Sequence, residues 1–408
     1  MKKTIKIVGG FYGERMMHPG YDALFGSGLR AAAALSALYS GIEFMTYATP
    51  DQGADLSAIG DAFGLRIAAS ERTQSIEFDY LHGSASPEVI PDLRIIRPCD
   101  PIAVSGDVVV RFGMLEGSGL VDADWAVFDP QTEVDPQPFH ANGSKAKHLA
   151  LVLNETEALA LSQADDLEEA AKTLLSLSPR TEVVVIKCDV RGALVCTKKR
   201  REWVRPYKTP SVFTLGSGDV FTAAFAYQWA VEGRTPAKAA EFASLATAFY
   251  CDNQFLPLPT DVEKLAKKQY RVLKPKGKPG QVYLAGPFFS LGERWVVEQL
   301  RDALLGYGFT VFSPFHDVGL GAPKSVAPAD LKGLRASSVV LACVDGMDAG
   351  TVFEVGYARS RKIPVVALST VPGRPEDLTM ITGSDCVLVH DMASAVYQTA
   401  WHLAERGK

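Results

Sequence analysis

Short β-branched runs alternate with longer Ala- and Leu-rich segments along this chain. Residues 5–8 and 183–186 have the character of strands, and residues 29–39 and 221–231 have the character of helices. Such alternation is typical of parallel sheets that are covered by helices. The sequence therefore predicts an α/β fold.

The pattern is interrupted once, after residue 256. Two prolines follow closely, then a short basic segment, and residues 274–280 read Lys-Pro-Lys-Gly-Lys-Pro-Gly, which disfavours both helix and strand. Beyond it the alternation restarts, with strands expected at 282–285, 339–344 and 365–368 and helices at 293–305 and 353–360. We expect two α/β units, 1–256 and 281–408, joined by a solvated basic Pro/Gly linker, 257–280.

Length and composition agree with two folded domains and narrow the partners. The chain has 408 residues, of which 47% are hydrophobic, and a net charge of −5, which gives no general attraction to nucleic acid or anionic lipid. No apolar stretch is long enough to span a membrane. The six cysteines are scattered, which favours a reducing cytoplasm and indicates neither a disulfide framework nor a structural metal site.

A glycine turn opens an apolar helix at Gly216-Ser217-Gly218-Asp219. Backbone N–H groups of such a turn, at a helix N-terminus, form a positive concavity that stabilises an anion or a developing phosphoryl charge. Asp219 is placed to take a proton from an attacking hydroxyl. The alternative is a plain turn in which Asp219 caps the helix.

This turn resembles the G-A-G-D signature of the ribokinase-like (PfkB) carbohydrate and nucleoside kinases. Further pieces in the family's order lie at 25–38, 49–53, 128–130, 154–157 and 183–195. The resemblance covers residues 1–256 and implies a ribokinase-like α/β/α domain that uses ATP and Mg²⁺. It implies Asp219 as general base, an anion hole of Gly216, Ser217 and Gly218, and Asn154 with Glu157 organising Mg²⁺ and phosphate without direct side-chain ligation of the metal.

The expected sugar side departs from the family pattern. Arg30 stands where the family usually has Asn, Glu14 stands near its early Asp, and Gln131 replaces the Asn that follows Asp-Pro. Glu14, Arg30 and Asp51 are the predicted acceptor-binding residues. Two alternatives stay open: an unusual acceptor, or a domain that binds a ligand without transferring phosphate.

In the second unit, Tyr283 and four carboxylates sit at strand ends or in first helical turns, where open α/β sheets place their ligands. The carboxylates are Asp330, Asp345, Asp348 and Glu354. Clustered carboxylates suit glycosidic chemistry, in which one attacks the anomeric carbon and another protonates or anchors the leaving group. For each residue alone, a helix cap or a solvated acid remains the alternative.

Together these segments resemble the nucleoside 2-deoxyribosyltransferase family, which includes nucleotide N-glycoside hydrolases. The most specific stretch is D-x-G-T-x-x-E-x-G-Y-A, at 348–358. The resemblance covers residues 281–400 and implies a flavodoxin- or Rossmann-like doubly wound sheet that needs no cofactor. It implies Glu354 as a nucleophile that forms a glycosyl-enzyme, Tyr283 orienting it, Asp330 serving the base as proton donor or anchor, and Asp345 and Asp348 contacting the sugar or base.

Two other features refine this resemblance. The turn after the first strand, Gly286-Pro287-Phe288-Phe289, is aromatic, which favours a nucleoside over a nucleotide and predicts that Gly286, Phe288 and Phe289 contact the substrate. Residues 379–383 resemble a segment that a neighbouring subunit inserts into the site, which implies a homo-oligomer of two or more chains.

The leading hypothesis is a bifunctional enzyme of nucleoside metabolism, with a glycosidic-bond domain fused to a sugar or nucleoside kinase domain. The second hypothesis makes the N-terminal domain a non-catalytic ligand-binding or regulatory module. A third makes the protein an effector that degrades a nucleotide signal. Base and sugar preference, transfer or hydrolysis, the kinase acceptor and the order of the two reactions stay open at this point.

Overall fold

The computed structural model describes residues 3–132, 134–371 and 375–406, and these form two compact units. The first comprises the described residues of Met1–Leu81, Ser86–Thr209 and Thr214–Arg271, and the second those of His82–Ala85, Pro210–Phe213 and Val272–Lys408. Within the described ranges, no helix has the length and apolarity needed to cross a membrane.

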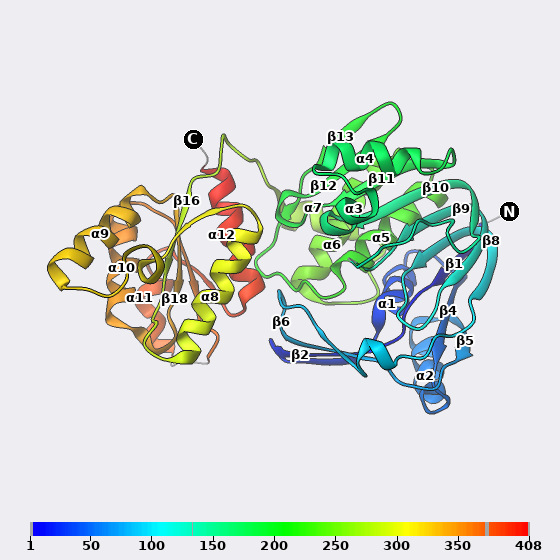
Figure 1. Ribbon diagram of the computed structural model, residues 1–408, viewed down its shortest axis with the longest axis horizontal. Helices are drawn as coiled ribbons and strands as arrows, with labels where there is room; N and C mark the ends of the chain where they lie inside the picture. The colour runs from blue at the N-terminus through cyan, green and yellow to red at the C-terminus, as the bar shows by residue number, and fades with distance from the viewer. Residues whose placement is uncertain (1–2, 133, 372–374, 407–408) are drawn as a thin grey trace. The chain divides into compact units, whose positions relative to one another are not determined.

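The first unit is built on a nine-stranded sheet (Figure 1). Seven strands run parallel, and the β11–β12 and β12–β13 pairs at one edge are antiparallel. The strands, in sheet order, are β13 (Arg201–Val204), β12 (Ala193–Thr197), β11 (Thr181–Lys187), β10 (Lys145–Asn154), β9 (Gly119–Asp129), β8 (Ile102–Phe112), β1 (Ile5–Val8), β4 (Ile42–Ala48) and β5 (Arg66–Glu71).

Helices cover this sheet on both sides. Helices α1, α5 and α6 pack against one another and against the sheet, α3 and α4 pack against β10 and β11, and α2 packs against β5. Their bounds are α1 (Gly26–Leu35), α2 (Gly53–Phe63), α3 (Glu155–Ser162), α4 (Leu167–Ser176), α5 (Ser217–Ala226) and α6 (Pro236–Asn253), with short turns η1 (Pro50–Gln52), η2 (Leu93–Ile95), η3 (Asp189–Arg191) and η4 (Tyr227–Val231).

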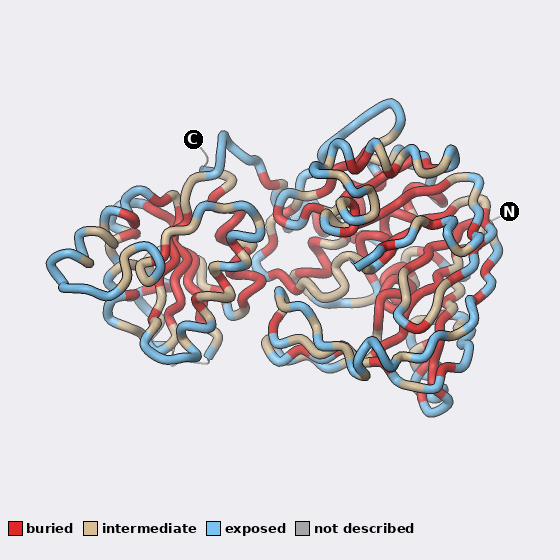
Figure 2. The backbone as a smooth tube through the Cα atoms, viewed as in Figure 1, coloured by how far each residue is buried: buried red, intermediate tan, exposed pale blue. Residues whose placement is uncertain are grey.

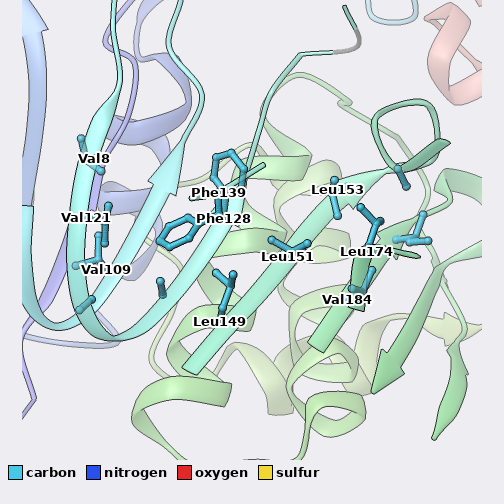
Figure 3. Packing of buried hydrophobic residues seen from close by; sticks show 14 of the residues in the cluster. Val8, Val109, Val121, Phe128, Phe139, Leu149, Leu151, Leu153, Leu174 and Val184 are labelled. Carbon is cyan, nitrogen blue, oxygen red and sulfur yellow. The ribbon is translucent and has the colours of Figure 1, made fainter. Parts of the chain in front are cut away.

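Because both faces are covered, the central strands are buried along most of their length (Figure 2). Alternate residues of each strand point to one face, so Leu149, Leu151 and Leu153 of β10 join one core cluster with Val184 of β11 and Leu174 of α4 (Figure 3). This layered arrangement confirms the α/β prediction for the first unit.

A separate four-stranded sheet, in the order β3-β2-β6-β7, belongs to the same unit. Its strands are β2 (Gly13–His18), β3 (Tyr21–Leu24), β6 (Glu77–His82) and β7 (Glu88–Ile90), and a two-stranded sheet pairs β14 (Tyr207–Lys208) with β15 (Arg271–Val272). Strand β2 carries Glu14, one of the predicted acceptor-binding residues.

The segment expected to be a solvated linker is partly ordered. Helix α7 (Val262–Gln269) lies inside it and packs against α6, with Val262 and Ala266 buried one turn apart. The Lys-Pro-Gly composition is confined to 274–280, whereas the apolar residues of the preceding segment share one helical face, which favours a helix. Residues 274–280 themselves contain neither helix nor strand.

The second unit has a five-stranded parallel sheet in the order β17-β16-β18-β19-β20. Its strands are β16 (Gln281–Ala285), β17 (Thr310–Phe312), β18 (Val339–Cys343), β19 (Val365–Leu368) and β20 (Val387–Val389), and its helices are α8 (Leu291–Gly306), α9 (Pro323–Ala336), α10 (Ala349–Ser360), α11 (Thr379–Thr382) and α12 (Met392–Glu405), with turns η5 (Pro314–Val318), η6 (Asp345–Met347) and η7 (Pro375–Leu378). The predicted doubly wound sheet is thereby confirmed.

Two core clusters show how this sheet is covered. Val282 and Leu284 face the side of α8 and α12, whereas Tyr283 and Ala285 face the side of α9, α10 and α11 (Figure 1). The chain leaves β16 toward β17 and leaves β18 toward β19, so the connections diverge between these adjacent strands. Ligands of open α/β sheets bind at the carboxyl ends of strands at such a point.

Candidate functional site

At the divergence point of the second unit, Tyr283 contacts Glu354. The Tyr283 hydroxyl donates a hydrogen bond to Glu354 Oε1 over 2.6 Å. Tyr283 is fully buried in β16, and Glu354 lies in the second turn of α10. Strand and helix therefore hold both groups on rigid elements, and the structure brings together the tyrosine and the glutamate that the sequence motifs singled out.

The surroundings of Glu354 favour its neutral form. Its pKa is raised to about 7, mainly by burial. The hydrogen bond from Tyr283 lowers this pKa, and the negative charges of Asp330 and Asp348 raise it further. A carboxylate with a pKa near neutrality beside an orienting hydroxyl is suited to nucleophilic or proton-transfer chemistry.

Asp330 lies on α9 and contributes a second carboxylate. Burial raises its pKa, and its charge acts on both Glu354 and Tyr283. Its Oδ1 atom is buried and accepts no hydrogen bond from any residue that the structure describes. A buried polar atom without a partner is costly, so this oxygen is the group best placed to meet a donor on a ligand.

The other two predicted carboxylates have structural partners. Asp348 caps α10, since its Oδ2 accepts hydrogen bonds from the Thr351 amide (2.7 Å) and hydroxyl (2.9 Å). Asp345 holds the turn after β19: it accepts from the Thr370 hydroxyl (2.6 Å) and amide (3.0 Å) and from the Ser369 hydroxyl (3.2 Å). Asp348 thus acts as a helix cap, and Asp345 ties the loop after β19 to η6.

Aromatic side chains line the same region in two groups. Phe312 stacks on Tyr283 with ring centroids 5.5 Å apart. Phe288 packs between Phe289 (5.0 Å) and Phe315 (5.2 Å), and Phe289 is 73% exposed. Phe312 therefore supports the orienting tyrosine, whereas Phe289 offers free ring surface to a base.

Close packing explains the glycine of the aromatic turn. A Cβ atom on Gly286 would lie 3.1 Å from Cys343 of β18 and 3.1 Å from Val297 of α8. Gly286 therefore lets the loop after β16 pass close to both elements. The side chain of His316 forms hydrogen bonds with Glu298 (3.0 Å) and Ser313 (3.0 Å), in keeping with a structural role.

In the first unit the predicted base is engaged by its own chain. Asp219 Oδ2 accepts a hydrogen bond from Arg30 (3.0 Å) and Oδ1 accepts one from Gln131 (2.9 Å). Arg30 also bonds both carboxylate oxygens of Glu14. Burial raises the pKa of Asp219, while the Arg30 charge and the Gln131 hydrogen bond oppose the rise.

The glycine turn has the geometry of a helix N-terminus. Gly216 adopts a left-handed conformation with φ 75°, and Ser217 and Gly218 open α5. The Ser217 amide donates to Thr214 O (3.0 Å) and the Asp219 amide donates to Gly216 O (3.1 Å). The predicted Ser217 donor is thus already used within the turn.

The remaining predicted residues of this unit lie at the start of α3 and in η1. Asn154 and Glu157 form the capping box of α3, each side chain accepting from the other's amide (2.7 and 2.8 Å). Asp51 is exposed in η1, and the buried neighbour Gln52 instead bonds Arg72. Among the described residues, no three His, Cys, Asp or Glu side chains gather as a metal site would require.

Sequence reasoning missed Lys187 at the end of β11. Its ammonium group donates to Asp129 Oδ2 (2.7 Å) and lies 3.2 Å from where a Cβ of Gly218 would be. A positive charge thus flanks the glycine turn. The available signal was a lysine that directly follows the apolar run 183–186.

Fold and site define a chain with a ribokinase-like unit and a nucleoside-deoxyribosyltransferase-like unit. Residues 143–254 match the family model of pfkB family carbohydrate kinases, and residues 282–379 match that of nucleoside 2-deoxyribosyltransferases. Both resemblances inferred from the sequence motifs are confirmed. No curated protein shows significant similarity to the chain.

Solved structures support the fold of the first unit. A ribokinase of Arabidopsis thaliana, complexed with ribose and ATP, is 16% identical to this chain, and the two structures superpose with a TM-score of 0.51. The match covers 65% of this chain and 99% of the ribokinase chain. A nucleoside kinase of Methanocaldococcus jannaschii, an archaeal member of the ribokinase family, is 12% identical with a TM-score of 0.50, covering 66% and 100%. At these identities the likeness establishes the ribokinase-like fold alone.

Proposed function

We propose that the second unit cleaves or transfers the N-glycosidic bond of a nucleoside or deoxynucleoside through a covalent bond to Glu354. The observation that carries this proposal is the 2.6 Å hydrogen bond from Tyr283 to Glu354 Oε1, beside the unpartnered oxygen of Asp330. The family match over 282–379 supports it.

The mechanism uses these three groups. Tyr283 holds Oε1, so Oε2 attacks the anomeric carbon, and the bond between that carbon and the base nitrogen breaks as the glycosyl ester forms. The departing base takes a proton from Asp330, or is held by it. Water or the nitrogen of a second base then attacks the anomeric carbon and gives its proton to Asp330. The glycosyl ester breaks, and the carboxylate of Glu354 is restored.

A nucleoside panel tests this proposal. The full-length protein should release free base from at least one nucleoside, and Glu354→Ala should abolish the release, whereas Asp302→Ala, which removes an exposed carboxylate of α8, should retain it. A 2-deoxy-2-fluoro nucleoside should label Glu354, detected by peptide mass spectrometry. Base release that survives Glu354→Ala would rule out the assignment, and release only from a nucleotide or NAD-type glycoside would favour the signal-degrading effector.

For the first unit, an ATP-dependent sugar or nucleoside kinase is the second candidate. The helix N-terminus at Gly216 and Gly218, with Lys187 beside it, fits a nucleotide phosphate, and Mg²⁺ would lie near Asn154 and Glu157. Bound ATP would supply the phosphoryl group. If the kinase is active, Asp219→Asn should abolish ATP-dependent phosphorylation and leave base release intact.

The proposal also includes a homo-oligomer formed through the second unit and a cytoplasmic location. Met380 of α11, within the segment expected to reach a neighbouring site, is 78% exposed and is therefore accessible for such a contact. Sedimentation velocity should detect a dimer or larger assembly that Met380→Glu weakens. A wild-type monomer at micromolar concentration would contradict the oligomer.

A further inference from the structure

Arg30 is a buried cation at the predicted acceptor site of the first unit. It extends from α1, is 1% exposed, and forms ion pairs with Asp219 (3.0 Å) and Glu14. Glu14 comes from β2 of the small sheet and Asp219 from the first turn of α5. Arg30 therefore ties together the three elements on which an acceptor would have to bind.

Each oxygen of Asp219 already accepts a hydrogen bond from the chain itself. Arg30 occupies Oδ2 and Gln131 occupies Oδ1, while Glu14 Oε1 accepts from the Gly26 amide as well as from Arg30. A general base must lie within hydrogen-bond reach of the hydroxyl whose proton it takes. In this arrangement a substrate hydroxyl would have to reach the remaining lone pairs of Asp219 past a buried guanidinium and an amide.

The packing around Arg30 also restricts access to Asp219. A Cβ atom on Gly216 would lie 2.1 Å from Arg30 Cδ and 2.5 Å from its Cζ, so the side chain runs directly against the glycine turn. Phe25 covers the guanidinium with its ring centroid at 5.2 Å, and Tyr21 contacts Nη2 at 3.4 Å. Arg30 thus fills the volume between the base and the turn.

Removing Arg30 from this position is electrostatically unfavourable. Glu14 and Asp219 are both buried, and without the guanidinium two carboxylates would face each other out of water. We propose that Arg30 is a built-in occupant of the acceptor site, which makes the first unit a module that does not transfer phosphate to sugars or nucleosides. This inference replaces the kinase candidate given above for the first unit with the non-catalytic alternative. It does not depend on the glycosidic activity of the second unit.

The test measures ADP formation by the full-length protein with ATP and Mg²⁺ across pentoses, hexoses, nucleosides, sugar phosphates and sugar acids. The wild type should form no ADP above the rate without acceptor. ADP formation with any neutral acceptor, lost in Asp219→Asn, would overturn the proposal. ADP formation with anionic acceptors only would overturn it too, and would make Arg30 a binding group for the acceptor's charge.

A charge-matched double variant tests the role of Arg30 itself. Glu14→Gln with Arg30→Asn removes one charge of each sign, so the cluster keeps its net charge while the acceptor volume opens. Calorimetric titration with ribose and adenosine should show binding at least about tenfold tighter than in the wild type. A folded double variant that binds neither ligand better would overturn the proposal, and if the variant does not fold, the wild-type ADP measurement decides.

Discussion

The Tyr283 hydroxyl and the Glu354 carboxylate are 71 residues apart in sequence and 2.6 Å apart in the structure. The hydrogen bond crosses from the middle of a buried strand to the second turn of a helix, and Phe312 stacks on the tyrosine ring behind it. The nucleophile proposed for the second unit is thus fixed at one oxygen. Its reactivity depends on groups whose effects on its pKa have opposite signs.

Tyr283→Phe should reduce the rate of base release and shift its pH dependence upward. The hydrogen bond from Tyr283 lowers the pKa of Glu354, so its loss raises that pKa and moves the acidic limb of kcat/KM above its wild-type position near pH 7. A hydrogen bond to a charged group contributes about 1.5–3 kcal/mol, which predicts a loss of about 10- to 150-fold. The measurement is the pH–rate profile of base release, and an unchanged acidic limb would contradict the proposed role of Tyr283.

Asp330→Asn should shift the same limb in the other direction. The Asp330 charge raises the pKa of Glu354, so neutralising it lets Glu354 ionise at lower pH. The rate should still fall, since the proposed proton donor is lost, and it should fall most for bases that are poor leaving groups. Profiles of both variants with one nucleoside provide the comparison; limbs that move together would show that Asp330 does not act on Glu354.

Local sequence motifs single out candidate site residues, but they do not specify which side chains those residues contact. Glu354, Tyr283 and the glycine turn follow from short patterns whose spacing fixes helix starts and strand ends. Asp219 and Arg30, in contrast, are separated by 189 residues, and no local pattern specifies that their side chains meet. The hydrogen bonds of Asp345 to Ser369 and Thr370 likewise could not be predicted locally, because they form only when β18 and β19 pair.

Glu354→Gln should stabilise the protein, and more so at high pH. The folded-state pKa of about 7 lies above the usual 4.5, so the stability that protonated Glu354 contributes is complete below pH 4.5 and is lost as the pH rises toward 7. At pH 8 the glutamine variant should gain up to about 3 kcal/mol, at about 1.36 kcal/mol per pKa unit. Urea unfolding at pH 5 and pH 8 tests this, with Asp302→Asn as a control that should show no such difference.

Gly333→Ala should weaken the support behind Tyr283. Gly333 lies in α9, and a Cβ there would be 2.4 Å from Phe312 Cζ, so the ring that stacks on Tyr283 must move. Overpacking of this kind costs about 1–3 kcal/mol and should lower both the melting temperature and the rate of base release.

Gly356→Ala is the matched control for that substitution. It lies in α10, two residues after Glu354, and a Cβ there would have no atom within 4 Å. Alanine should therefore stabilise the helix by about 0.5–1 kcal/mol and leave the rate unchanged. If Gly333→Ala behaved like Gly356→Ala in thermal melts and base release, the stacked Phe312 would have no part in holding Tyr283 against Glu354.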